Sequence, residues 1–190
     1  MANEGSITRL LAEVAEGRAG AEDRLFVRVY DELRVMASAR LGDERAFSGG
    51  AGDPEDLVHD AYARVVGETL VNRRQLFFMY ARAMRQILVD RARRNLAAKR
   101  GGDRHRVMRD PETMADEFAG PGLDVMDIDD LLTKLRVASE READVVELRY
   151  FGGLSDTVVG QLLGVSERTV RNDWSSARER LRGWLADDGV

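Results

Sequence analysis

The chain of 190 residues carries, from Leu154 to Leu181, the segment LSDTVVGQLLGVSERTVRNDWSSARERL, and this segment decides the fold. Apolar residues three and four apart predict a short helix that ends at Leu163. Gly164 then supplies the left-handed backbone of a tight turn, and Ser166 is a favourable N-cap for a second helix. The pattern predicts a helix-turn-helix at about residues 155–182.

The second helix of this motif has two contrasting faces. One is an apolar stripe spaced by four and three residues: Val170, Trp174, Ala177, Leu181 and Trp184. The other holds the residues that we expect to bind duplex DNA: Arg168, Thr169, Arg171, Asn172, Ser175 and Arg178. Arg and Asn pair with base edges, and Ser and Arg bind phosphate. Asp173 would repel phosphate, so we expect it to orient an Arg neighbour. The alternative is an antiparallel helix pair that merely packs.

Helical spacing of apolar residues extends outward from this motif over most of the chain, whereas the alternation typical of strands is nearly absent. The expected helices span residues 6–16, 21–41, 54–66, 74–98, 128–139, 140–150, 156–163 and 167–185. Gly42 is expected to end the second helix, and residues 46–52 to form a loop. Residues 101–124 hold four of the 18 glycines and two of the three prolines, and therefore predict a linker.

These observations predict an all-α fold of two small helical domains joined by a flexible linker. We expect the N-terminal domain at residues 1–99, the acidic linker at 100–125 and the C-terminal domain at 126–190. A domain of fewer than about 80 residues has a thin core, so each domain would be marginal alone and would lean on partners.

A cluster of acids marks the third predicted helix. Asp53 is a good N-cap, and Pro54 fits the first helical position. The cluster consists of Asp53, Glu55, Asp56 and Asp60. The helix dipole favours acids in the first turn and explains the first three as well as any function does, but Asp60 lies one turn further on. A compact acidic patch is suited to docking a basic helical partner.

The fourth predicted helix combines aromatic and basic residues. Phe77, Phe78 and Tyr80 are followed by Arg82 and Arg85. Bases stack on aromatic rings and phosphates need cations, so this combination is typical of binding to single-stranded DNA. The alternative is a solvated basic face above core aromatics.

Composition and charge exclude several classes of function. The absence of cysteine excludes disulfides, thiolate metal sites and cysteine nucleophiles. No nucleophile–base pair, paired carboxylate or phosphate loop stands out, so we expect no catalytic residue, no metal and no cofactor. No signal peptide or membrane-spanning run is visible, and we expect a cytoplasmic protein.

The net charge of −5 hides a strong polarity along the chain. Residues 82–109 hold ten Lys/Arg against two Asp, whereas residues 110–130 hold eight Asp/Glu and no Lys/Arg. This polarity indicates one surface for a polyanion and another for a basic partner or for self-shielding.

The order of an acidic helix, an aromatic–basic helix and a helix-turn-helix resembles the extracytoplasmic-function (ECF) sigma factors of the sigma-70 family, which initiate bacterial transcription. The stretch DPEDLVHDAYARVV (53–66) is similar to the helix by which that family grips the clamp coiled coil of RNA polymerase. The stretch RRQLFFMYARAMRQILVDRARR (73–94) resembles its promoter-melting helix, and LRYFGGLSDTVVGQLLGVSERTV (148–170) the region that reads the minus-thirty-five element. The resemblance covers nearly the whole chain outside the linker.

The resemblance implies a division of labour among the residues singled out above. Binding to core polymerase would fall to Asp53, Glu55, Asp56 and Asp60. A flipped base of the minus-ten element would be held around Asn72 and Arg73, while Arg82 and Arg85 would neutralise the strand. The minus-thirty-five duplex would be bound by Arg168, Thr169, Arg171, Asn172, Ser175 and Arg178. The acidic stretch 110–130 would pass through the polymerase toward the RNA exit path.

The implied partners are core RNA polymerase, through its clamp coiled coil and its flap, and promoter DNA. An anti-sigma factor or a regulatory kinase is a further candidate. The free chain is expected to be a monomer that contacts no membrane and is not an enzyme. Two alternatives stay open: a stand-alone dimeric helix-turn-helix regulator, and a polymerase-binding decoy that lacks promoter opening.

The sequence departs from the family pattern at two positions of the helix-turn-helix. The family usually has an acidic residue where Val158 stands and alanine where Gly160 stands. A glycine costs about 1 kcal/mol of helix stability relative to alanine, so we expect a less stable first helix in this motif.

Overall fold

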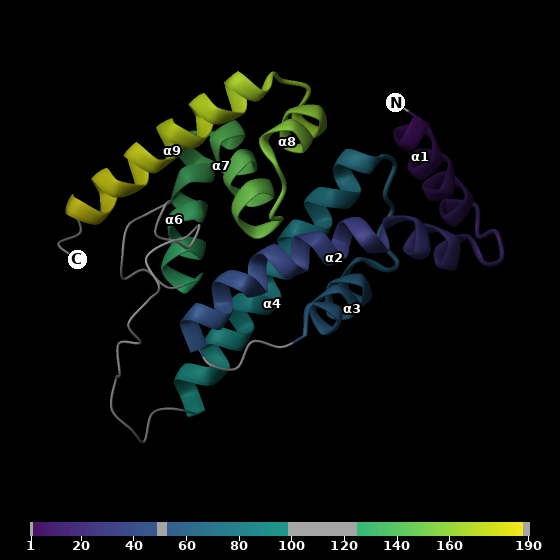
Figure 1. Cartoon of the computed structure of the whole chain (residues 1–190), viewed down its shortest axis with the longest axis horizontal. Coiled ribbons are helices and arrows are strands. Elements are labelled where there is room, and N and C mark those ends of the chain that lie inside the picture. The colour runs from purple at the N-terminus through teal and green to yellow at the C-terminus, as the bar shows by residue number, and fades with distance from the viewer. Residues whose placement is uncertain (1, 49–52, 99–124, 188–190) are drawn as a thin grey trace.

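The computed structural model describes residues 2–48, 53–98 and 125–187, which form helices and contain no strand (Figure 1). The predicted all-α fold is therefore confirmed. The elements are α1 (Ala2–Ala15), α2 (Ala21–Ser48), α3 (Pro54–Val65), α4 (Arg73–Ala98), α6 (Val125–Ala138), α7 (Glu140–Val146), η1 (Glu147–Phe151), α8 (Asp156–Leu163) and α9 (Glu167–Asp187).

In the N-terminal half, which comprises α1 to α4, α3 packs against both α2 and α4, and α1 packs against the first part of α2. Val29 and Leu33 of α2, Leu57 of α3, and Phe77 and Met84 of α4 are fully buried at these contacts. The expected apolar stripes of these helices therefore form the core of this half.

The turns at the ends of α1 and α2 follow the glycines only in part. Gly17 and Gly20 adopt left-handed backbone angles, with φ of 68° and 70°, and they terminate α1 and precede α2. By contrast, α2 continues through Gly42 to Ser48, so the predicted end at residue 41 is wrong. A helix tolerates one glycine at a cost of about 1 kcal/mol when good helix formers flank it, as they do here. The rest of the predicted loop, residues 49–52, lies outside the described residues.

In the C-terminal half, which comprises α6 to α9 with η1, α7 packs against α6 and α9, and α8 packs against α9. The predicted helix 140–150 has the right extent, but its last part, η1, is a π-helical turn. The Gly152 N–H donates to the Glu147 carbonyl at 3.0 Å, and a Cβ on residue 152 would lie only 2.4 Å from the Leu148 carbonyl oxygen. A glycine is therefore required where this turn closes.

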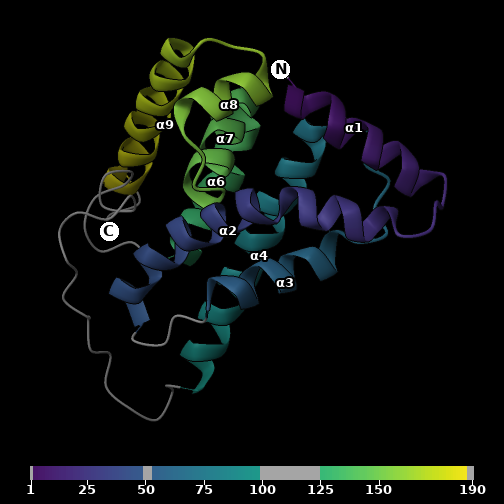
Figure 2. The same ribbon diagram turned by 45° about the vertical axis from the view of Figure 1, so that its right-hand side comes forward.

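The two halves of the chain pack against each other through α4, which contacts α6 and η1 (Figure 2). Buried apolar side chains from both halves belong to one continuous cluster. Residues 100–124 of the predicted linker lie outside the described residues, and α6 begins at Val125, the last residue assigned to that linker. The division into two domains stays a prediction.

Candidate nucleic-acid and protein interfaces

The helix-turn-helix is built by local capping. The Ser155 hydroxyl accepts from the Val158 N–H at 3.4 Å at the start of α8, and Gly164 ends that helix with φ of 70°. Ser166 accepts from the Thr169 N–H at 3.1 Å and starts α9. The predicted bounds of the first helix, the turn glycine and the N-cap of the second helix are all confirmed.

Gly160, which stands where the family usually has alanine, lies at the tightest point of this motif. A Cβ on this residue would lie 2.8 Å from the Val165 carbonyl oxygen, closer than backbone atoms tolerate. The glycine thus lets the turn approach α8 closely, which offsets the helix propensity that it lacks.

The two faces of α9 separate largely as predicted. Val170, Trp174, Ala177 and Leu181 are buried, whereas Trp184 is only half-buried. Of the residues expected to bind DNA, Arg168, Arg171, Asn172 and Ser175 are exposed, while Thr169 and Arg178 are half-buried. The Thr169 hydroxyl lies 2.9 Å from the Ser166 hydroxyl, so it takes part in the cap.

The acids of α9 are held by protein partners. Asp173 is buried and accepts from Arg141 Nε at 2.7 Å and Nη2 at 3.0 Å, which ties α9 to α7 and raises the pKa of Arg141. Glu167 accepts from the Thr157 hydroxyl at 2.7 Å and lies 3.5 Å from Arg171. The expectation that Asp173 orients an arginine thus agrees with the structure, and neither acid stands free to repel phosphate.

The acidic cluster lies along α3, and its four members make different contacts. The Asp53 carboxylate accepts from the Glu55 N–H at 3.0 Å and caps the helix. Asp60 pairs with Arg91 of α4 at 3.1 Å. Glu55 and Asp56 are exposed, and no described side chain pairs with either. These two are therefore the acids most available to a basic partner.

Beside this cluster, four rings meet between α2 and α3, and none of them was among the predicted site residues. The Phe26 ring lies 4.4 Å from Tyr62 and 5.7 Å from His59, and Tyr30 lies 5.4 Å from Phe26, measured between centroids. His59 is exposed and the other three are half-buried. The signal in the sequence was the spacing of three between His59 and Tyr62, which places both rings on one face of a helix.

The turn before α4 is organised by Asn72. Its side-chain oxygen accepts from the Gln75 N–H at 2.9 Å, and Gln75 accepts from the Val71 N–H at 3.1 Å. Asn72 is exposed, but Arg73 points inward, where it pairs with Glu32 at 2.7 Å and lies 4.7 Å from the centre of the Phe77 ring. The two residues expected to hold a flipped base therefore do not share one surface.

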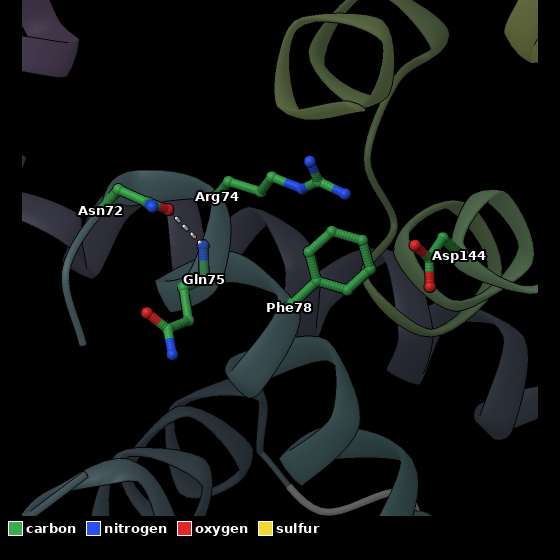
Figure 3. Close-up of a pocket in the computed structure, with 5 residues that line it drawn as sticks. All are labelled: Asn72, Arg74, Gln75, Phe78 and Asp144. Atoms are coloured by element: carbon green, nitrogen blue, oxygen red, sulfur yellow. Dashed lines mark hydrogen bonds between the residues drawn. The ribbon is translucent and has the colours of Figure 1, made fainter. Parts of the chain in front are cut away.

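A pocket of about 400 Å³ opens next to this turn, lined by Asn72, Arg74, Gln75, Phe78 and Asp144 (Figure 3). The guanidinium carbon of Arg74 lies 5.6 Å from the centre of the Phe78 ring, and Asp144 reaches the pocket from α7. Amides, a guanidinium and an aromatic ring together suit a nucleic-acid base. Arg74 and Gln75 were not among the predicted site residues, whereas Phe78 was named as one of the aromatic residues of the helix expected to bind single-stranded DNA. Arg74 and Phe78 have the spacing of four that joins side chains on a helix.

The two arginines expected to neutralise the strand lie in different surroundings. Arg82 is exposed. Arg85 is 14% exposed and faces the C-terminal half, with its Nε 3.5 Å from Asp129 and 3.3 Å from Glu147. Burial raises the pKa of Glu147, although Arg85 and Arg136 act in the opposite direction.

The comparison with known families agrees with this arrangement. A family model described as ECF sigma factor matches residues 4–187, nearly the whole chain. The chain belongs to the ECF sigma factor family. Neither the search of curated proteins nor the search of solved structures found a match.

As a member of this non-enzymatic family, this sigma factor acts in transcription initiation and binds RNA polymerase and promoter DNA. Within the described ranges, no group of acids and histidines could hold a metal ion, and no helix is long and apolar enough to cross a bilayer. The resemblance drawn from the order of the sequence motifs is confirmed.

Proposed function

We propose that this sigma factor recruits core RNA polymerase through α3 and reads a promoter at two separate elements. Asp53, Glu55, Asp56 and Asp60 contact the polymerase clamp, with Glu55 and Asp56 as the most accessible acids. Asn72 holds a flipped minus-ten base together with the pocket beside it, and Arg73, which pairs with Glu32 and packs on Phe77, positions that turn. Arg82 and Arg85 neutralise the melted strand. The protein acts where its polymerase is, in the cytoplasm.

Reading of the minus-thirty-five element is assigned to α9. The observation that carries the proposal is its exposed face, on which Arg168, Arg171, Asn172 and Ser175 follow directly after the capped turn. The N-terminal part of a recognition helix enters the major groove, so these residues are the ones that reach base edges and phosphates. Thr169 and Arg178 flank them.

Free DNA affinity is expected to be poor because the net charge is −5 and each reading surface is small. Polymerase tethers both surfaces near one promoter and raises the effective concentration of each. Specific binding then emerges only in the holoenzyme. Duplex binding by the free protein as tight as that of the holoenzyme would contradict this account.

The test is in vitro transcription with core polymerase on a pool of promoter fragments. Defined transcripts should require the protein and disappear with Asp56→Lys. The control is Glu16→Lys, which makes the same charge change at an exposed acid of the α1–α2 turn and should leave transcription intact. If the protein binds polymerase but starts no transcript, the decoy function replaces this one; if it does not bind polymerase, the dimeric regulator does.

A further inference from the structure

Glu167 is an acid on the surface that is proposed to enter the major groove. It is the first residue of α9, directly after the Ser166 cap, and its side chain is 47% exposed. An unpaired carboxylate in this position would repel DNA phosphates, whereas Arg168 and Arg171 attract them. The helix dipole favours an acid in the first turn, but the contacts of Glu167 extend beyond that turn.

Two partners hold the Glu167 carboxylate. The Thr157 hydroxyl of α8 donates to Oε1 at 2.7 Å, and Arg171 Nη1, one turn further along α9, lies 3.5 Å from Oε2. A free glutamate side chain loses rotamer entropy when it binds a ligand, and these contacts remove part of that cost in advance. A carboxylate offers about four acceptor sites, so both oxygens can accept further hydrogen bonds.

The glycine at position 160 permits this contact between the two helices. A Cβ on residue 160 would lie 2.8 Å from the Val165 carbonyl oxygen and 3.6 Å from the Glu167 nitrogen, so the start of α9 lies close against α8. Thr157 precedes Gly160 by three residues and therefore lies on the same face of α8. The close approach that the glycine allows thus brings the Thr157 hydroxyl to the Glu167 carboxylate.

The carboxylate and the neighbouring guanidinium are open to a ligand. Thr157, Glu167 and Arg171 are exposed, and all three line a hollow of about 500 Å³ where α8 meets the start of α9. The side chain of Arg171 is 58% exposed, so its pairing with Glu167 leaves most of the guanidinium donors accessible. A base edge can therefore reach an acceptor and a donor side by side.

The chemistry of base edges decides what this pair can read. Carboxylate oxygens only accept hydrogen bonds, and cytosine presents a donor in the major groove, its N4 amino group. Guanine O6 and N7 and thymine O4 are acceptors, which a carboxylate repels, and adenine sets its N7 acceptor beside its amino group. The guanidinium of Arg171, by contrast, is suited to O6 and N7 of guanine.

We propose that Glu167 is a specificity-determining residue that selects a cytosine in the minus-thirty-five element, and that Thr157 is the residue that positions its carboxylate. This proposal rests on the proposed reading of that element by α9. Glu167 and Arg171 are four residues apart, about 6 Å along the helix axis, so the guanine read by Arg171 lies within about two base pairs of the cytosine. Bases that present an acceptor to Glu167 are rejected, so the carboxylate adds specificity.

The test is selection of promoter duplexes by the holoenzyme. One fragment that the holoenzyme transcribes is randomised over its minus-thirty-five element, and the bound sequences are counted by sequencing. We expect the wild type to prefer cytosine about tenfold at one position, with a guanine preference within about two base pairs of it. Glu167→Gln should remove the cytosine preference and leave the other positions unchanged, because an amide nitrogen replaces one acceptor oxygen with a donor.

The matched control is Glu179→Gln, which removes one negative charge from an exposed acid of the same helix and should change no base preference. Two variants test the positioning role of Thr157. Thr157→Val removes the hydroxyl at nearly constant shape and should weaken the cytosine preference about threefold, whereas Thr157→Ser restores the hydroxyl and should keep it.

The outcomes separate the role of Glu167 from the proposed function. Equal base preferences of the wild type and Glu167→Gln would overturn the proposal, even if the affinity for all sequences changed together, because Glu167 would then be a structural acid only. If the wild type enriches a minus-thirty-five sequence without the cytosine, only the role of Glu167 is wrong. If it enriches no sequence there, the proposed reading by α9 fails too.

Discussion

The replacement Gly152→Ala tests how tightly the π-helical turn is built. The new Cβ would lie 2.4 Å from the Leu148 carbonyl oxygen, whereas ordinary contacts begin at 3.4 Å. Relief requires the carbonyl to move, which strains two hydrogen bonds: Gly152 N–H to Glu147 at 3.0 Å and Leu154 N–H to Leu148 at 3.2 Å. At about 1 kcal/mol for each bond and a similar amount for displaced packing, the loss of stability should be about 2–3 kcal/mol.

The matched control is Gly183→Ala, which lies inside α9 with nothing within 4 Å of its new Cβ. It should stabilise the protein by about 0.5–1 kcal/mol, because alanine favours the helix over glycine. Urea unfolding followed by far-ultraviolet circular dichroism measures both variants. Equal effects of the two, or a Gly152→Ala variant as stable as the wild type, would refute the argument that the turn requires glycine.

Three further changes probe other contacts. Arg141→Ala leaves Asp173 buried without its two hydrogen bonds and should lower the free energy of unfolding by about 1–2 kcal/mol, measured with urea; no loss would mean that this ion pair contributes nothing to holding α9 on α7. Arg168→Ala should leave unfolding unchanged but weaken holoenzyme binding to minus-thirty-five DNA about tenfold, measured by competition; unchanged binding would remove Arg168 from the interface. The Arg24 guanidinium holds the pKa of Glu13 below its ordinary 4.5, so the Arg24–Glu13 ion pair between α2 and α1 stabilises the fold above pH 4.5. This contribution is lost as pH falls through the lowered pKa. The pKa of Glu13, measured by NMR titration, should rise in Arg24→Gln, and an unchanged pKa would contradict the role given to Arg24.

Local chemistry made the helix-turn-helix and the start of α3 predictable. The αL turn at Gly164, the caps at Ser166 and Asp53, and Pro54 at the first helical position each depend on neighbours within a few residues. Gly42 was predicted to end α2 by the same kind of rule, but the flanking helix formers outweigh one glycine.

The orientation of the arginines could not be predicted in the same way. Arg73 and Arg85 each look like exposed cations in the sequence, yet each finds an acid far along the chain: Glu32 for Arg73, and Asp129 and Glu147 for Arg85. Helical spacing shows which residues share a face but not which element covers that face. The pocket residues Arg74 and Gln75 were missed for the same reason.

The chain has only two tryptophans, and both lie on α9. Trp174 is buried with the Arg149 guanidinium 4.3 Å from its ring centre, and Trp184 is half-buried near the other end of the helix. Light at the long-wavelength edge of protein absorption, where only tryptophan absorbs, therefore excites the recognition helix and no residue of the N-terminal half. This gives the protein a built-in fluorophore: docking of α9 on DNA or on a protein surface should change its emission without any label, while events confined to α1–α4 should not.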